Sequence, residues 1–210
     1  MIPHTVPAQE RRWHRTVVIR GKSYPTRSYA PTVHGSAPEH YGLPLEQVDL
    51  LSAVHEAAHA VAVLAGRGRL NHVQLPAPAA GTGADSPGGV TDWRSPMPTV
   101  EGFAAVLGAG ERAADRWLRE QGLWSPERAV AVEIGAWGDR ELLLDAGNRG
   151  TVGFGEEDKA TDYFVVHDLA DALLDQHWPA VTALAEHLVE RRYLTGDQVA
   201  DLTGLPVVQS

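Results

Sequence analysis

The segment Leu45–Gly66, LEQVDLLSAVHEAAHAVAVLAG, constrains the fold more than any other part of the sequence. Its apolar residues recur at spacings of three and four, it is rich in alanine, and it ends at a glycine, so it predicts a helix. His55 and His59 then lie one turn apart on one face, with Glu56 beside them. In so apolar a helix, two uncompensated imidazoles and a carboxylate cost several kcal/mol unless something binds them.

The spacing of these residues, H-E-x-x-H, is suited to a zinc ion. Two histidines at i and i+4 on a rigid helix aim both rings at one point, and zinc binds neutral imidazoles in tetrahedral geometry. Glu56 would then accept a proton from the attacking water, whose pKa the cation lowers. The alternative is a histidine pair with a purely structural role.

Composition limits the ligands that such an ion could have. The chain has 210 residues, which suits one domain, and it contains no cysteine. Disulfides, thiolate-bound zinc and iron–sulfur clusters are therefore excluded, and any metal must bind His, Asp or Glu. The first residues lack the apolar core of a secretory signal, and the longest apolar run, Ala57–Gly66, is too short to span a bilayer. We expect a soluble cytoplasmic protein that does not contact a membrane.

Charge divides the chain into a basic, Pro-rich arm at residues 1–45 and an acidic domain at residues 46–210. The arm has six Lys and Arg against two Asp and Glu, whereas the rest has 12 against 25. We expect the arm to lie against its own acidic domain and not to bind nucleic acid. Its sequence RTVVIRGKSY predicts a short strand and turn. The RGKS at Arg20–Ser23 is not a phosphate loop, because Thr16 occupies the position of the first glycine.

The remaining elements predict a mainly α fold with a small β hairpin or edge strand. Two short runs, HVQLPAP and GGVTDW, have the composition of strands. Ser125 is predicted to cap a helix that has Pro126 at its first position. A helix at residues 160–178 is predicted to end or kink at Pro179, where another begins. Thr195 and Gln198 form a capping box for the last helix, and residues 99–122 predict one more.

Several of these segments resemble the FtsH-type ATP-dependent zinc metalloproteases. AVHEAAHAVAVLAG resembles the HEAGH helix of that family, and HVQLPAP with GGVTDW resembles its strand and substrate-edge segment. VLGAGERAADRWL and ALAEHLVERRYLTGDQVADL are similar to two later stretches, so the likeness covers about residues 48–204 in order. Ala58 replaces the glycine before the second histidine. The ATPase module and the membrane anchors of the family have no counterpart in this sequence.

The resemblance implies a third zinc ligand, an aspartate on a later helix. GAWGDRELLLDAG fits the context of that residue, with Asp139 as the ligand. Asp158 in GEEDKATDY is the alternative, since metal geometry alone would accept either carboxylate. Three further histidines, His72, His167 and His177, are lesser candidates.

The resemblance also implies a helical zincin-like domain with the activity of a zinc-dependent peptidase. Zinc would be held by His55, His59 and Asp139, with Glu56 as the general base. The expected substrate is unfolded or flexible polypeptide, unless a separate ATPase partner supplies the unfolding. Its backbone would dock on the segment from Gly89 to Trp93 as an added strand, through Gly89, Val90 and Thr91.

Two other classes of function remain open at this point. One is a non-peptidase zinc hydrolase or tailoring enzyme that acts on a small substrate. The other is a non-catalytic binding protein whose metal site is structural. Glu56 argues against the binding protein, because a structural zinc needs no general base. The sequence does not give the oligomeric state.

Overall fold

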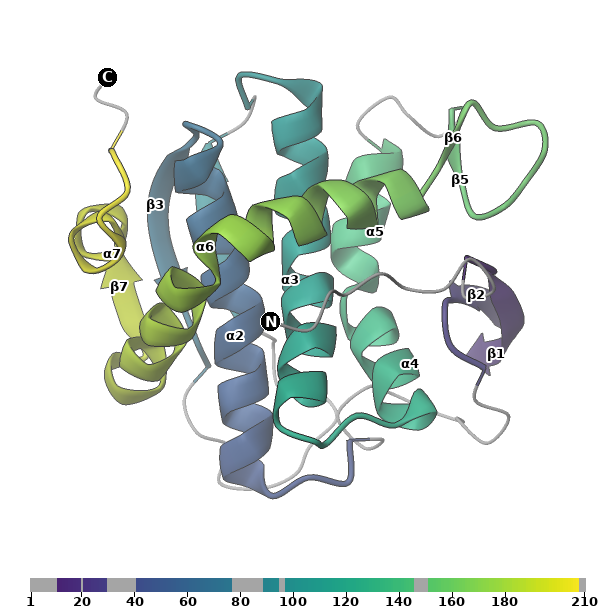
Figure 1. Ribbon diagram of the computed structural model, residues 1–210, viewed down its shortest axis with the longest axis horizontal. Coiled ribbons are helices and arrows are strands. Elements are labelled where there is room, and N and C mark those ends of the chain that lie inside the picture. The colour runs from purple at the N-terminus through teal and green to yellow at the C-terminus, as the bar shows by residue number, and fades with distance from the viewer. Residues whose placement is uncertain are drawn as a thin grey trace.

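Three long helices form the core of the computed structural model of the chain (Figure 1). They are α2 (Leu45–Ala65), α3 (Val100–Glu120) and α6 (Phe164–Arg191), and each packs against the other two. The expected fold class, mainly α with small β elements, is confirmed. The structure describes residues 11–19, 21–29, 41–76, 89–94, 97–145 and 151–207.

Helix α2 is the centre of this core. Nearly every residue from Leu51 to Leu64 is buried, including Glu56 and His59. By length and composition α2 could cross a membrane, but 67% of its most apolar 18-residue window is buried inside the fold. Because α3 and α6 cover it, α2 has the packing of a core helix.

Local signals shape α3 and α6, through a capping side chain at the start of α3 and a proline inside α6. The Thr99 side chain accepts a hydrogen bond from the backbone N–H of Gly102 and so caps α3. The sequence predicted that a helix ends or kinks at Pro179. The helix does not end there, because Pro179 lies inside the single 28-residue helix α6. The helix changes direction along its length (Figure 1), as an interior proline favours by removing one i to i−4 hydrogen bond.

A three-stranded antiparallel sheet covers one side of this helical core (Figure 1). Its order is β4 (Val90–Arg94), β3 (Arg69–Gln74) and β7 (Tyr193–Thr195), so β4 is an edge strand and β3 is its only partner in the described chain. The sequence did not predict β7. It leads directly into α7 (Gly196–Thr203), whose Thr195–Gln198 capping box is confirmed.

Two short helices follow α3. Ser125 caps α4 (Pro126–Gly135), as predicted, by accepting a hydrogen bond from the backbone of Arg128. The next helix, α5 (Trp137–Leu143), has only seven residues and no side-chain cap at its N-terminus. Such a short helix is not stable alone, so tertiary contacts must hold it. Two strands of two residues each, β5 (Val152–Gly153) and β6 (Thr161–Asp162), pair in parallel before α6.

The described part of the N-terminal arm is a β hairpin that packs on the domain. Strands β1 (His14–Ile19) and β2 (Lys22–Thr26) pair antiparallel around a turn in which Gly21 has a φ of 78°. Basic side chains of this segment contact acidic ones of the domain, as expected from the charge distribution. These pairs are Arg11 with Asp168, Arg15 with Glu156 and Lys22 with Glu141. The rest of the predicted arm, residues 1–10, 20 and 30–40, lies outside the described residues.

Candidate metal centre

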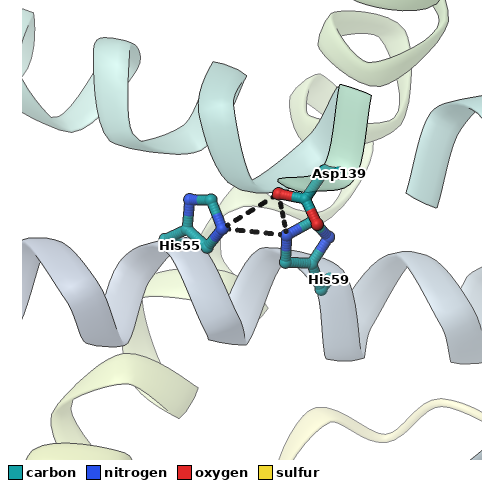
Figure 2. A group of neighbouring side chains, drawn as sticks. All are labelled: His55, His59 and Asp139. Carbon is teal, nitrogen blue, oxygen red and sulfur yellow. Dashed lines mark hydrogen bonds and ion pairs between the residues drawn. The ribbon is translucent and has the colours of Figure 1, made fainter. Parts of the chain in front are cut away.

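The side chains of His55, His59 and Asp139 converge on one point between α2 and α5 (Figure 2). The two histidine Nε2 atoms are 3.0 Å apart. Asp139 Oδ2 lies 3.4 Å from Nε2 of His55 and 3.3 Å from Nε2 of His59. The structure thus brings together the three residues predicted as metal ligands, although they are up to 84 positions apart in the sequence.

These separations suit a tetrahedral zinc ion. At bond lengths of about 2.0–2.1 Å, two ligand atoms of a tetrahedron are about 3.3 Å apart. The three observed separations, 3.0, 3.4 and 3.3 Å, are close to that value on every edge. The three atoms therefore have the spacing of one face of such a tetrahedron.

The orientation of His59 is fixed by α3. Its Nδ1 donates a hydrogen bond of 2.7 Å to the carbonyl oxygen of Val106, which leaves the lone pair of Nε2 directed at the other ligands. Gly110, one helical turn further along α3, lies against both rings. A Cβ at Gly110 would be only 2.6 Å from His55 Nε2 and closer still to His59 Nε2. The absence of a side chain at residue 110 keeps the space beside both nitrogens open.

The electrostatics of the site favour a positive charge where the three residues meet. Burial lowers the pKa of His59, but the negative charge of Asp139, its hydrogen bond, and the charge of Glu56 outweigh burial and raise the pKa to about 9. Burial raises the pKa of Asp139, but the charge of His59 and hydrogen bonds from both histidines hold it well below its usual range. The same arrangement would stabilise a metal cation in place of the proton.

Glu56 is held beside the site by the edge strand β4. The Thr91 hydroxyl donates a hydrogen bond of 2.7 Å to Glu56 Oε2 and also lies 3.1 Å from the Glu56 backbone oxygen. Gly89 lies against the same carboxylate, since a Cβ there would be 2.8 Å from Glu56 Oε1. Glu56 does not belong to the group of convergent ligand atoms, which fits the divergence of about 100° between neighbouring side chains on a helix.

The other predicted candidates lie elsewhere. The side chain of Asp158 is 76% exposed and lies 3.6 Å from Lys159 Nζ, and it is not part of the convergent group. His72 on β3 lies 3.5 Å from Asp92, and His167 on α6 is buried against Glu111. His177 lies on α6, outside the ligand group. Val90, predicted to bind substrate with Gly89 and Thr91, is 49% exposed on β4.

Sequence reasoning missed two parts of the site, Gly110 and the Val106 carbonyl. A glycine inside a helix costs about 1 kcal/mol relative to alanine, so Gly110 in the middle of a 21-residue helix indicates a close approach by another group. That signal was available. The Val106 carbonyl has no signal in the sequence, because every residue carries one.

Comparison with known proteins gives no family. No protein-family model matches the chain, and no curated protein has a significantly similar sequence. The fold and the site define a mainly helical domain with a His, His, Asp group that could hold a metal ion. The function must therefore be inferred from the chemistry of the site.

Proposed function

We propose that the protein is a zinc-dependent peptidase that hydrolyses peptide bonds in unfolded or flexible polypeptide. The observation that carries this proposal is the convergence of two imidazole nitrogens and one carboxylate oxygen at the separations of a zinc tetrahedron, with Glu56 following His55 on the same helix. Three protein ligands leave one tetrahedral position for a further ligand, which is the arrangement of catalytic zinc sites and not of structural ones.

Partial exposure of the ligands supports a catalytic role. The side chains of His55 and Asp139 are 21% and 23% exposed, whereas that of His59 is only 7% exposed. The two ligands His55 and Asp139 thus reach the protein surface in part, as a site that admits a substrate requires. A zinc ion bound at this site would act as a Lewis acid, which polarises the scissile carbonyl and makes water a better nucleophile.

The remaining chemistry falls to Glu56 and to β4. Glu56 accepts the proton that the attacking water loses and delivers it to the leaving amine. The Thr91 hydroxyl fixes one carboxylate oxygen, and a carboxylate has about four lone-pair sites, so acceptor capacity remains for that proton. Peptide hydrolysis by these residues consumes one water and releases a carboxylate and an amine.

The edge strand favours polypeptide over a small molecule as substrate. Within the described chain β4 pairs only with β3, so its other edge is suited to bind an extended peptide backbone. Gly89, which directly precedes this strand, and Thr91 within it contact Glu56. A peptide docked along β4 would run past the general base. A zinc hydrolase that acts on a small substrate would use the same ligands without needing this strand.

The test is Glu56→Gln, assayed with a denatured protein such as casein. Wild type purified with zinc should contain about one ion per chain. The glutamine keeps the size of the side chain and can still accept the Thr91 hydrogen bond, but it cannot accept a proton. Zinc content and thermal stability should stay near wild type, while cleavage falls at least about a hundredfold.

Each contrary outcome has a distinct meaning. Full activity of Glu56→Gln would exclude Glu56 as the base, and loss of zinc from this variant would make Glu56 a ligand. Wild type that binds zinc but cleaves no polypeptide would transfer the proposal to a small substrate. Wild type that binds no zinc would contradict the metal centre itself.

A further inference from the structure

The residue next to Asp139 is among the most deeply buried charged side chains in the described structure. Arg140 is 1% exposed, and its guanidinium donates four hydrogen bonds to groups from three other elements. Nε and Nη2 form a bidentate pair with Glu111 of α3, both at 2.8 Å. Nη2 also bonds Glu133 of α4 at 3.0 Å, and Nη1 bonds the carbonyl of Pro25 at 2.7 Å.

Aromatic rings enclose the same guanidinium. Its Cζ lies 5.3–5.9 Å from four ring centroids, which belong to Trp13, Trp137, Phe154 and Tyr163. Cation–π attraction is strongest where the cation is desolvated, as it is here. Trp13 and Pro25 belong to the N-terminal segment, so the hairpin completes the surroundings of Arg140.

This arrangement ties α5 to α3 at the metal site. Asp139 and Arg140 are neighbours on α5, while Gly110 and Glu111 are neighbours on α3. Gly110 lies against the imidazoles of His55 and His59, so the Glu111–Arg140 pair joins the two helices one residue away from the ligand contacts. A seven-residue helix without a side-chain cap has little stability of its own. Its location therefore depends on bonds such as these.

We propose that Arg140 is a positioning residue for Asp139, and that its bidentate pair with Glu111 sets the metal affinity of the site. This inference rests on the metal centre proposed above. The planar fork of arginine fixes direction as well as distance, because two parallel N–H bonds meet two carboxylate oxygens. The N-terminal hairpin thereby acquires a role at a site that it does not itself line, since Pro25 and Trp13 help to hold the guanidinium.

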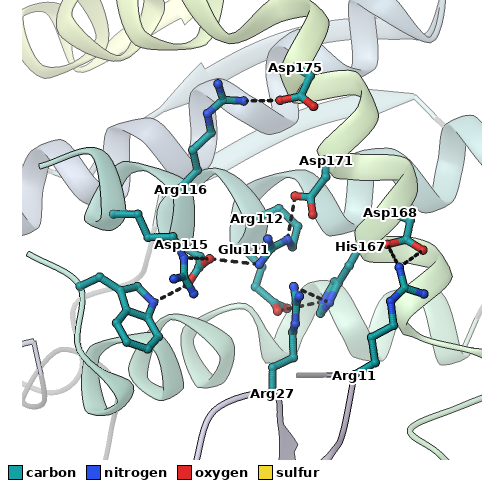
Figure 3. Close-up of polar contacts among 12 residues, drawn as sticks. Arg11, Arg27, Glu111, Arg112, Asp115, Arg116, His167, Asp168, Asp171 and Asp175 are labelled. Atoms are coloured by element: carbon teal, nitrogen blue, oxygen red, sulfur yellow. Dashed lines mark hydrogen bonds and ion pairs between the residues drawn. The ribbon is translucent and has the colours of Figure 1, made fainter. Parts of the chain in front are cut away.

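The test compares Arg140→Lys with Arg112→Lys in the full chain. Lysine keeps the charge but cannot form the fork. Arg112 is a matched control, because it is also buried and paired, and its partners Asp115 and Asp171 (Figure 3) lie on α3 and α6 and not on α5. Arg140→Lys should weaken zinc binding at least about tenfold, in the range for lost outer partners of metal ligands. Arg112→Lys should change the zinc Kd by less than about twofold, within ordinary additivity error.

Two further readouts separate positioning from general loss of stability. The visible absorption of bound Co2+ reports ligand geometry, and it should change in Arg140→Lys but not in Arg112→Lys. In an Asp139→Ala background, Arg140→Lys should weaken metal binding by no more than about a further twofold, because the group that it positions is gone. If Arg140→Lys folds poorly, Arg140→Met combined with Glu111→Met removes the fork without leaving either partner as a buried unpaired charge, and it should weaken zinc binding equally.

Several outcomes would overturn the inference. An unchanged zinc Kd and Co2+ spectrum in Arg140→Lys would do so, as would equal losses in the two lysine variants. If Arg140→Lys lowered metal affinity in the Asp139→Ala background as much as it does in wild type, Arg140 would not act through Asp139. If wild type itself binds neither zinc nor Co2+, the metal centre and the inference fail together, whereas the other outcomes leave the metal centre standing.

Discussion

Two neighbouring residues of α3 belong to two polar clusters that are built in opposite ways. Gly110 lies against the imidazoles of the candidate metal centre, while Glu111 lies in a buried network with Arg140 and His167. In the network, carboxylates face guanidinium groups. Figure 3 shows His167 and Arg27 together on the same side of Glu111. In the metal centre, two nitrogens and a carboxylate oxygen face one another without a Lys or Arg partner among the described residues.

The difference separates a structural cluster from a binding site. Buried charges whose partners belong to the same chain are satisfied when the protein folds, so the network needs no ligand. Ligand atoms that converge with one net negative charge are satisfied only by a proton or a cation between them. Substitutions at the candidate metal centre should therefore change metal binding. Substitutions in the network should change stability, except at Arg140, through which the network acts on Asp139.

The largest effect on metal binding is expected from Asp139→Ala. The two histidines would be left to hold the ion alone, so zinc affinity should fall at least about a hundredfold, more than is lost with an outer partner. Asp158→Ala is the matched control, because Asp158 is an exposed carboxylate outside the ligand group. It should leave the zinc Kd, measured by competition with a chromophoric chelator, unchanged. The reverse result would transfer the ligand role to Asp158.

An intermediate effect is expected from Gly110→Ala. The new methyl group would overlap Nε2 of both histidines, and their flexible side chains can swing away only by abandoning the convergent geometry. Zinc affinity should fall at least about tenfold, as it does when a residue that orients a metal ligand is removed. Stability of the metal-free protein should change by only about 1–2 kcal/mol, because overpacking is partly offset by the better helix propensity of alanine.

Gly138→Ala is the control for this variant. Gly138 lies on α5 beside Asp139, and a Cβ there would meet no atom within 4 Å. Its substitution should stabilise the protein by up to about 1 kcal/mol and leave zinc affinity intact. Unchanged zinc binding in Gly110→Ala would mean that the ligand atoms do not converge beside α3.

The structural features that were predicted correctly from the sequence are those that depend on local signals. The helix over Leu45–Gly66 and the caps at Ser125 and Thr195 agree with the structure, because periodicity and capping act within a few residues. Of the two outcomes predicted at Pro179, an end or a kink, the end was wrong. Helix α6 continues through this residue because it packs against α2 and α3, and tertiary packing can outweigh the cost of one interior proline. Local propensity alone could not choose between an end and a kink.

The candidate metal centre and the network also differ in how much of each could be predicted from local signals in the sequence. The spacing within H-E-x-x-H indicates a site because a single helix orients His55 and His59 together. Asp139 was expected only from resemblance to a family, and the structure brings it within reach of both histidines. The network left no such trace. Glu111 and Arg140 are 29 positions apart, and their pairing depends on how α3 and α5 pack.

The smallest effect on metal binding, and the clearest effect on stability, is expected from His167→Gln in the network. Burial and the positive charges of Arg27 and Arg112 outweigh the attraction of Glu111 and lower the pKa of His167 to about 4. In the unfolded chain the pKa is about 6.5, so between these values the unfolded state binds a proton that the folded state does not. His167 therefore makes the folded protein lose stability as the pH falls from about 6.5 to 4.

Glutamine does not titrate, so this loss should be absent from the variant. Burial raises the pKa of Glu133, which titrates with the opposite sign, and for that reason the wild type must be compared with the variant and not read alone. In urea unfolding with a chelator present, the stability of wild type relative to His167→Gln should fall by about 2 kcal/mol between pH 7 and pH 4.5. The zinc Kd at pH 7 should be the same in both proteins. A variant that loses zinc affinity while keeping the wild-type pH dependence would make His167 part of the metal centre and would end the division between the two clusters.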